Sequence, residues 1–261
     1  MEIADKDIFH LYKPLGISPL DLIKGLKTRC VELRDKKMTY AGRLDPMARG
    51  VVLIIAGKEL DNFHEHLKYD KSYKAKILFS FSTDSYDLLG FPKYQFNNLK
   101  NQKIRDTLNS FKGCFEFKIP PFSGYKVKGK PLFKWALDGK LHQIAIPQKK
   151  VQIKSLSIQN IDEINKFNLK KIINKKISRV TGDFRQKETI ERWNNLLSNV
   201  EEDNFKVVEL KISCSSGTYI RSIAHEAGKK MKASALLFDL TRTEVGNWAI
   251  DDSISIFDLK D

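Results

Sequence analysis

Apolar and polar residues alternate in two segments of the chain, and this period of two predicts half-buried strands. Residues 71–83 alternate most clearly, with Tyr73 and Phe81 on the apolar side. Residues 206–214 follow the same pattern. A third segment, 51–56, is apolar at every position, which is typical of a strand buried on both faces. Shorter strands are predicted at 8–12, 114–119 and 151–158.

Apolar residues spaced three and four positions apart predict helices between these strands. Ser18 precedes Pro19, and Asp21 follows two positions later, so the serine is expected to cap a helix and the aspartate to bond back. Further helices are predicted at 59–68, 131–137 and 189–197, in a segment that starts near Ile104 and ends at Gly113, and in a segment capped by Thr218 and ended by Gly228. The pattern as a whole predicts a mixed α and β chain.

Composition adds a strong positive charge to this picture. The chain has 261 residues, enough for one large domain or two small ones, and 41% of them are hydrophobic. Lys and Arg number 46 against 32 Asp and Glu, which gives a formal net charge of +14. This surplus favours a polyanionic partner, nucleic acid first and an anionic membrane second. The alternative is that lysine is abundant only as a solvating residue.

Several other classes of protein are disfavoured by the sequence. Cys30, Cys114 and Cys214 are isolated from one another, so neither a zinc site nor a disulfide framework is indicated. His64 and His66 lie two positions apart on a predicted helix, a poor spacing for a metal, and both are expected at the surface. Residues 1–7 are polar and no apolar run reaches the ~20 residues of a membrane helix. We expect a soluble, cytoplasmic protein.

The most informative acidic residue is Asp45, which lies between two turn signals. Gly42 permits backbone angles that other residues avoid, and Pro46 fixes its own φ and disfavours helical geometry at Asp45. Because the apolar run 51–56 follows, Asp45 is expected on a rigid loop that enters a core strand. Catalytic side chains are often placed in this way. An ordinary Asp-Pro turn is the alternative interpretation.

The wider stretch around Asp45 resembles a family motif. Residues 42–51, Gly-Arg-Leu-Asp-Pro-Met-Ala-Arg-Gly-Val, resemble the G-T-L-D-P-x-A-x-G-V block of the TruB family, the bacterial tRNA pseudouridine-55 synthases. In that family the aspartate of this block is catalytic, which implies Asp45. Further blocks of the family are matched at residues 13–18, 71–90, 119–129, 214–224 and 240–246. The resemblance covers most of the chain, except one insert and the C-terminal end.

The resemblance implies a set of site residues. Tyr73 matches the family's active-site aromatic, although a core aromatic on a strand is the alternative. Arg221 matches the arginine that pairs with the catalytic aspartate; as a cation in the first turn of a helix it needs a carboxylate partner, and we expect a bidentate contact. A surface arginine is the alternative. Candidate RNA-binding residues are Tyr40, Arg43, Lys71, Lys126, Lys128, Tyr219 and Leu240. Lys126 and Lys128 could equally form a solvated hairpin edge.

The implied reaction is the isomerisation of uridine to pseudouridine. It involves no net redox change or hydrolysis, so we expect no cofactor and no metal, and the sequence contains no dinucleotide, P-loop or zinc motif. One carboxylate is needed, acting on a base that has left its stack. The implied partner is the T-arm stem-loop of tRNA, and we expect no membrane or small-molecule partner. A monomer is expected.

The implied fold is the pseudouridine synthase fold, an α/β (α+β) domain with a central, mixed but mainly antiparallel sheet flanked by helices. We expect one catalytic domain over 1–261, with a basic insert of irregular register at about 159–204 and without the family's C-terminal PUA domain. The insert could add RNA contacts or merely decorate the surface. Tyr40 replaces a usual histidine, and Arg43 and Arg49 replace usual threonines and are expected to add charge beside Asp45.

These departures leave the RNA less certain than the chemistry, so two alternatives stay open. The first is a catalytically idle RNA-binding or tRNA chaperone protein on the same scaffold. The second is a pseudouridine synthase acting on another RNA stem-loop, including one that belongs to a guide-RNA complex.

Overall fold

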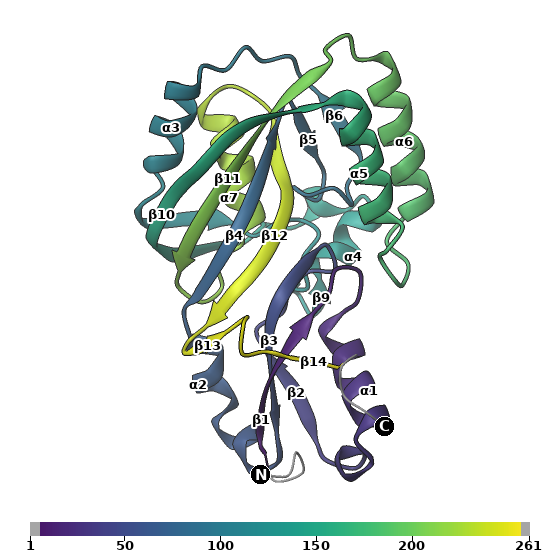
Figure 1. Cartoon of the computed structure of the whole chain (residues 1–261), viewed down its shortest axis with the longest axis vertical. Helices are drawn as coiled ribbons and strands as arrows, with labels where there is room; N and C mark the ends of the chain where they lie inside the picture. The colour runs from purple at the N-terminus through teal and green to yellow at the C-terminus, as the bar shows by residue number, and fades with distance from the viewer. Residues whose placement is uncertain (1–5, 257–261) are drawn as a thin grey trace.

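A mixed β-sheet organises the chain in the computed structural model, which describes residues 6–256 (Figure 1). Its strands are β1 (Ile8–Lys13), β2 (Met38–Ala41), β3 (Ala48–Ala56), β4 (Lys71–Phe79), β7 (Gly113–Lys118), β10 (Gln148–Asn165), β11 (Asn204–Cys214), β12 (Ala235–Val245), β13 (Trp248–Ala249) and β14 (Ile254–Ser255). Two small ribbons pair β5 (Phe81–Thr83) with β6 (Pro92–Tyr94), and β8 (Lys126–Val127) with β9 (Lys130–Pro131).

The strand order of the main sheet is β14-β1-β3-β12-β4-β11-β10-β7, with β2 paired to β3 and β13 paired to β12. The pairs β1–β14 and β3–β12 are parallel, and the other pairs of the described sheet are antiparallel. The predicted mixed, mainly antiparallel sheet is therefore confirmed. The parallel pair β3–β12 joins the strand that follows Asp45 to the segment around Leu240, which is 195 positions further along the chain.

Helices cover both faces of this sheet. The helices α1 (Pro19–Arg29), α3 (Asn101–Asn109) and α7 (Ile220–Lys230) contribute to the largest core, together with the alternate residues of β4 from Tyr73 to Phe79. The helices α5 (Lys166–Ile177) and α6 (Gln186–Asn199) pack on the opposite face of the sheet. Leu78 of β4 points to that face and joins the second core with them. Because β3 is covered on both faces, its side chains are buried from Gly50 to Ala56, as the unbroken apolar run predicted.

The start of α1 confirms the predicted capping box. The backbone N–H of Asp21 donates to Ser18 Oγ at 3.2 Å, and the backbone N–H of Ser18 donates to Asp21 Oδ2 at 2.9 Å. Pro19 is the first helical residue, where its missing N–H costs no hydrogen bond. The helix therefore begins at the predicted residue, and Leu22, Ile23 and Leu26 form its buried face.

The predicted ends of α7 are wrong. The N-cap is Tyr219, not Thr218, because the Thr218 hydroxyl donates to the Ser215 carbonyl at 2.8 Å instead of to the helix. Gly228 lies inside the helix, which continues to Lys230. A Cβ at position 228 would lie 2.7 Å from the backbone nitrogen of Ala235. Gly228 therefore allows the helix to approach β12 closely and does not end it.

One of the two histidines was also placed wrongly. His64 is exposed, as expected, but His66 is only 3% exposed, in the short helix α2 (Phe63–Lys68) after a 3₁₀ segment at Gly57–Asn62. Its Nε2 lies 2.7 Å from Glu59 Oε1, and its ring packs edge-on against Tyr69. The glutamate satisfies Nε2, whereas Nδ1 has no hydrogen-bond partner among the described residues.

The segment 159–204 is more regular than expected. Residues up to Asn165 continue β10 and pair with β11, although bulges interrupt the register near Ser155 and Asn160. The remainder forms α5 and α6, which pack on each other and bury Trp193 completely. Five of the nine basic residues of this segment lie in α5, and eight acidic residues of the same segment nearly balance the nine. We call residues 166–199 the helical insert.

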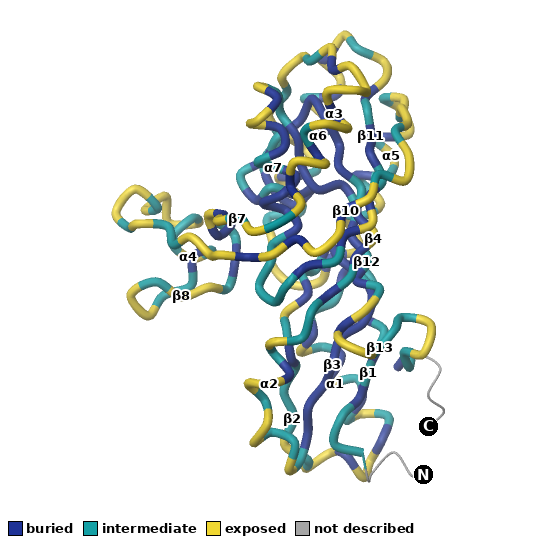
Figure 2. The backbone as a smooth tube through the Cα atoms, turned by 90° about the vertical axis from the view of Figure 1, so that its left-hand side faces the viewer, coloured by how far each residue is buried: buried dark blue, intermediate teal, exposed yellow. Residues whose placement is uncertain are grey.

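An arm projects from the body of the molecule (Figure 2). It carries the ribbon β8–β9 and the helix α4 (Leu132–Leu137), and many of its residues are exposed. Within residues 6–256, no helix is long and apolar enough to span a membrane. The polar residues 1–5 lie outside the described part of the chain.

Candidate active site

Asp45 lies on a loop whose backbone is fixed at several points. Gly42 has a φ of +88°, so the expected need for glycine is confirmed. The Pro46 carbonyl accepts a hydrogen bond from the Gly16 N–H at 2.8 Å, and the Asp45 carbonyl accepts one from the Ala48 N–H at 3.0 Å. These contacts hold Asp45 just before the start of β3, and its side chain is 30% exposed.

Arg242 anchors this loop through its guanidinium. It was not identified as a site residue from the sequence. It is 1% exposed and donates to the carbonyls of Val51, Gly42 and Arg43 at 2.7, 3.2 and 3.3 Å. Gly50 makes this close approach possible, because a Cβ there would lie 2.0 Å from the Arg242 carbonyl oxygen. The sequence signal that could have identified Arg242 is its place in the matched block at 240–246.

Arg221 meets Asp45, as predicted, but the contact is not bidentate. Its Nε lies 2.9 Å from Asp45 Oδ2, and no acceptor among the described residues has hydrogen-bond geometry to that nitrogen. Its Nη1 donates to the Ser85 carbonyl at 2.8 Å and its Nη2 to the Phe122 carbonyl at 3.3 Å. The terminal nitrogens hold the guanidinium in place, and only one edge of the group is left for the carboxylate.

A second carboxylate, Asp87, faces the same guanidinium. Its Oδ2 is 3.6 Å from Arg221 Nη1, and its Oδ1 accepts hydrogen bonds from the Ser85 hydroxyl and the Leu89 N–H at 2.6 and 3.0 Å. Burial raises the pKa of Asp87, while Arg221 opposes that rise. Burial disfavours the charge on Arg221, but Asp45 and then Asp87 hold the pKa of its guanidinium above the ordinary value. Asp87 stood in a matched motif but was not predicted as a site residue.

A cavity of about 300 Å³ opens beside this ion pair. Its lining includes all three predicted catalytic residues and four of the predicted RNA-binding ones: Asp45, Tyr73, Arg221, Arg43, Lys71, Tyr219 and Leu240. These residues come from β4, β12, α7 and the loops before β3 and α7. The topology therefore brings together positions that are up to 197 residues apart in the sequence.

Tyr73 lines this cavity and is 8% exposed. Burial raises the pKa of its phenol to about 12, although nearby Arg242 works against that rise. The phenol is therefore neutral near pH 7 and can donate a hydrogen bond. The same neutral state makes it a poor base, which bears on any proton-transfer role.

Two lysines near the cavity are unusually buried. Lys71 is 5% exposed, and its ammonium donates to the carbonyls of Leu67 and Tyr69; burial lowers its pKa to about 8. This ammonium is engaged by backbone carbonyls, and the RNA contact expected for Lys71 stays a prediction. Lys13 is fully buried and donates to the carbonyls of Pro14 and Ile17. Burial lowers its pKa to about 7, against the opposing pull of Asp45.

The other predicted RNA-binding residues lie away from the cavity lining. Tyr40 is half-buried on β2 and packs against the main core. Lys126 and Lys128 are exposed on the arm, where Lys128 has a φ of +50°. Their RNA contacts stay predictions.

The expectation that Arg49 adds charge beside Asp45 is wrong. Its Nη1 and Nη2 donate to Asp239 Oδ1 and Oδ2 at 3.2 and 2.8 Å, so a different carboxylate neutralises it. Lys176 from α5 donates to the same carboxylate. Arg43 keeps the expected position: it is exposed and lines the cavity next to Asp45.

The comparisons with known proteins agree with this fold. The sequence model of the TruB family pseudouridylate synthases (N-terminal domain) matches residues 30–177. The tRNA pseudouridine synthase B of Protochlamydia amoebophila is 30% identical over 95% of this chain and 77% of its own length. The enzymes of the same name from Clostridium tetani and Malacoplasma penetrans are 29% and 26% identical, over 97% and 99% of this chain and 72% and 93% of their own lengths.

Solved structures show the same fold at lower sequence identity. A chain of a Cbf5-Nop10-Gar1 complex superimposes with a TM-score of 0.60 and 17% identity, over 97% of this chain and 53% of its own length. A chain of an H/ACA RNP bound to a substrate RNA containing 2′-deoxyuridine superimposes with a TM-score of 0.57 and 16% sequence identity. The match covers 97% of this chain and 51% of that chain. This chain therefore spans about half the length of those chains, and the likeness concerns the fold alone.

The family model and the relatives show that the chain is a pseudouridine synthase, which is an isomerase. The chain belongs to the TruB family.

Proposed function

We propose that this chain isomerises the T-loop uridine of tRNA, position 55, to pseudouridine, with Asp45 as the catalytic carboxylate. The observation that carries the proposal is the Asp45–Arg221 ion pair at the edge of a cavity that Tyr73 and Leu240 also line. The names of the relatives support tRNA as the substrate. The formal charge of +14 suits a phosphate backbone.

The proposed role of Asp45 follows from its ion pair with Arg221 and from the part of its carboxylate that stays exposed. An ionised carboxylate can act as a nucleophile or stabilise an oxocarbenium-like sugar. Arg221 favours the ionised form and orients it. Because Arg221 reaches only Oδ2 and the side chain is 30% exposed, part of the carboxylate remains available to a substrate in the cavity.

The base is proposed to leave its stack and enter the cavity, with Tyr73 against its ring and Leu240 nearby. In the cavity the C1′–N1 bond breaks, the base turns, and a C1′–C5 bond forms. The C5 proton leaves and N1 gains a proton, so atoms balance without any co-reactant. Because the phenol of Tyr73 is neutral, we assign it stacking and hydrogen-bond donation at this step.

Tritium release from a T-arm stem-loop carrying [5-³H]uridine tests the proposal, because the C5 hydrogen is lost only if the isomerisation occurs. The native chain should release tritium, whereas Asp45→Asn should release none above background. Asp106→Asn, which changes an exposed aspartate on α3, is the matched control and should behave as the native chain. Equal release by the native chain and Asp45→Asn would refute the assignment.

Two other outcomes correspond to the alternatives. An idle RNA-binding protein would bind tRNA in a salt-sensitive manner, retain binding in Asp45→Asn, and form no pseudouridine. A synthase for another stem-loop would be inactive on the T-arm but active on total RNA. The Asp45–Arg221 contact and the open cavity favour an active enzyme over the idle protein.

A further inference from the structure

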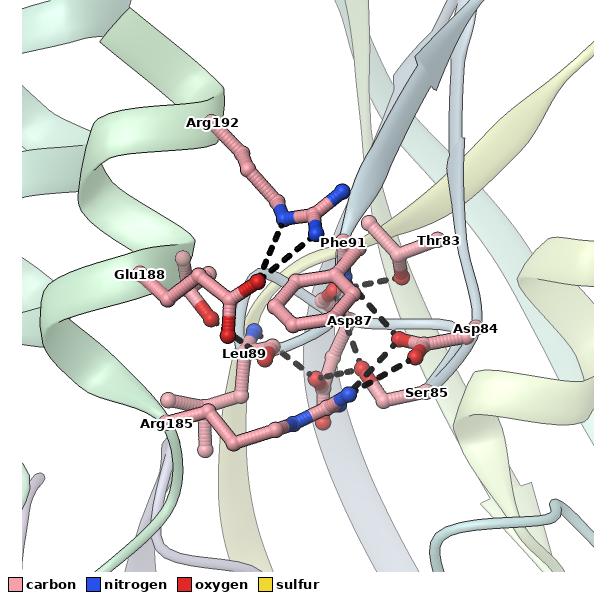
Figure 3. Close-up of polar contacts among 10 residues, drawn as sticks. Thr83, Asp84, Ser85, Asp87, Leu89, Phe91, Arg185, Glu188 and Arg192 are labelled. Carbon is pink, nitrogen blue, oxygen red and sulfur yellow. Dashed lines mark hydrogen bonds and ion pairs between the residues drawn. The ribbon is translucent and has the colours of Figure 1, made fainter. Parts of the chain in front are cut away.

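The helical insert sends one side chain to the active site. Arg185 precedes α6 with a φ of +62°, a left-handed conformation that is uncommon for residues other than glycine. Its Nη1 and Nη2 lie 3.1 and 3.4 Å from Asp84 Oδ2 and Oδ1, and Figure 3 shows the side chain reaching across from the insert to this carboxylate. Its guanidinium also lies 4.1 Å from the ring centre of Phe91 and 4.4 Å from that of Phe122.

These contacts join two separate segments of the chain. Asp84 and Phe91 belong to the loop 83–91, and the Phe91 N–H donates to Asp84 Oδ1 at 2.9 Å. Phe122 lies between β7 and β8. Arg221 is held by the same two segments, through the carbonyls of Ser85 and Phe122. Arg185 therefore links the two backbone segments that hold the Arg221 guanidinium.

The rest of α6 supports the same loop. The Trp193 Nε1–H donates to the Leu88 carbonyl at 3.1 Å, and the Thr189 hydroxyl donates to the Leu89 carbonyl at 3.3 Å. The loop needs such support because Tyr86 has a φ of +67°. A residue in that region persists only when its surroundings hold it there.

We propose that Arg185 is a positioning residue: it fastens the loop 83–91 to Phe122 and so keeps Arg221 aligned with Asp45. This inference rests on the proposed function, because it treats the Asp45–Arg221 pair as catalytic. It gives the helical insert a role in catalysis through alignment of the ion pair. A displacement of about 1 Å in such a pair can cost about a hundredfold in rate.

The chain offers a matched control in Arg192. Its guanidinium lies 4.0 Å from the centre of the same Phe91 ring, but its ion pair is with Glu188 of its own helix. Arg185→Ala and Arg192→Ala therefore remove the same charge and the same kind of ring contact. Only Arg185→Ala also removes a link between the two segments, since the contacts of Arg192 are with Glu188 and Phe91.

The kinetic test uses the full-length chain under single-turnover and steady-state conditions on a substrate RNA. Arg185→Ala should lower kcat and the single-turnover rate about 10- to 100-fold, with the KM and the Kd for RNA changed less than threefold. Arg192→Ala should stay within about twofold of native in all four values. Arg185→Lys, which keeps the charge, should recover part of the rate. A raised KM with unchanged kcat, or equal behaviour of the two alanine variants, would overturn the proposal.

A second measurement does not depend on activity. Hydrogen exchange at Arg221 Nε–H, followed by NMR and assigned with Arg221→Lys, should be at least about tenfold faster in Arg185→Ala and unchanged in Arg192→Ala. If the native chain forms no pseudouridine, the proposed function fails, but this measurement still decides whether Arg185 positions Arg221.

Asp84→Asn is the second variant, for use if Arg185→Ala does not fold. It keeps the ring contacts and removes the ion pair, so it should lower kcat in the same way but less. Native kcat and native exchange in Asp84→Asn would also overturn the proposal.

Discussion

The cluster of carboxylates and cations around Asp239 and the one around Arg221 are built differently. Around Asp239, the cations Arg49 and Lys176 supply three hydrogen bonds to one carboxylate. Around Arg221, two carboxylates share one guanidinium, and Asp45 is reached at one oxygen alone. The first cluster satisfies its charge within the protein, whereas the second leaves a carboxylate facing a cavity.

Electrostatics reflect the same difference. Burial alone would raise the pKa of Asp239, but Lys176 and Arg49 hold it below its usual value. Asp87, by contrast, keeps a raised pKa in spite of Arg221. The comparison teaches that an ion pair matters for chemistry when part of it is left unsatisfied, since a fully satisfied pair has nothing to offer a substrate.

The largest contrast is expected when each aspartate is changed to asparagine. Asp45→Asn should lower the rate of pseudouridine formation by at least about a thousandfold, because no carboxylate then faces the sugar or base. Asp239→Asn should keep activity within a few-fold but lower the free energy of unfolding by about 2 kcal/mol, because two cations lose their partner. Tritium release and urea unfolding measure the two effects.

The stability loss in Asp239→Asn should depend on pH in a defined direction. A carboxyl whose pKa is lowered by folding stabilises the protein above its unfolded pKa. The difference between native and variant should therefore be complete at pH 7 and shrink below about pH 4. An Asp239→Asn variant that is inactive but fully stable would remove the distinction between the clusters.

Arginine-to-lysine exchanges should give the next largest contrast. Arg221→Lys should reduce kcat about a hundredfold, because an ammonium cannot reach Asp45 while also bonding the carbonyls of Ser85 and Phe122. Arg49→Lys should stay within about threefold, since a surface-facing lysine can still pair with Asp239. Steady-state kinetics on a T-arm substrate separate the two, and similar kinetics for both variants would contradict the comparison.

Lys13 provides a smaller effect with a defined sign. Its pKa of about 7 in the folded chain lies below the ordinary 10.5, so between these values the unfolded state binds more protons. Stability should therefore rise with pH across this window. The free energy of unfolding of the native chain minus that of Lys13→Met should increase by up to about 1 kcal/mol per pH unit from pH 7 to 9. Urea unfolding at several pH values tests this, and a constant difference would contradict it.

The smallest effects are expected at the exposed cations of the arm. Lys126→Ala or Lys128→Ala should weaken tRNA binding only a few-fold and reduce the slope of log Kd against log salt concentration by about one each. The rate of the bound complex should not change. A native salt slope in both variants would favour the alternative in which these lysines form only a solvated hairpin edge.

Much of the fold could be predicted from the sequence because periodicity is local. The alternation of β4 and β11, the unbroken run of β3 and the capping box at Ser18 each depend on neighbouring residues, and each was placed within a few positions. The meeting of Asp45 with Arg221 came from the family resemblance, because no local pattern connects positions 176 residues apart. The catalytic role of both residues stays a prediction.

The rest could not be predicted because it depends on side-chain geometry set by distant contacts. Arg221 contacts Asp45 through Nε alone because its terminal nitrogens bond the carbonyls of Ser85 and Phe122. No sequence motif indicates these two backbone contacts. The burial of Arg242 beneath the Asp45 loop requires the parallel pairing of β3 with β12. Arg49 was misplaced because its partner, Asp239, lies on that same distant strand.

The most direct test of the central claim is to map pseudouridine at nucleotide resolution in total RNA from cells that lack their own enzyme for the T-loop uridine, supplied with the native chain or with Asp45→Asn. The account predicts pseudouridine at position 55 of tRNA with the native chain and an unmodified uridine there with Asp45→Asn. Modification at position 55 by both proteins, or by neither, would contradict it.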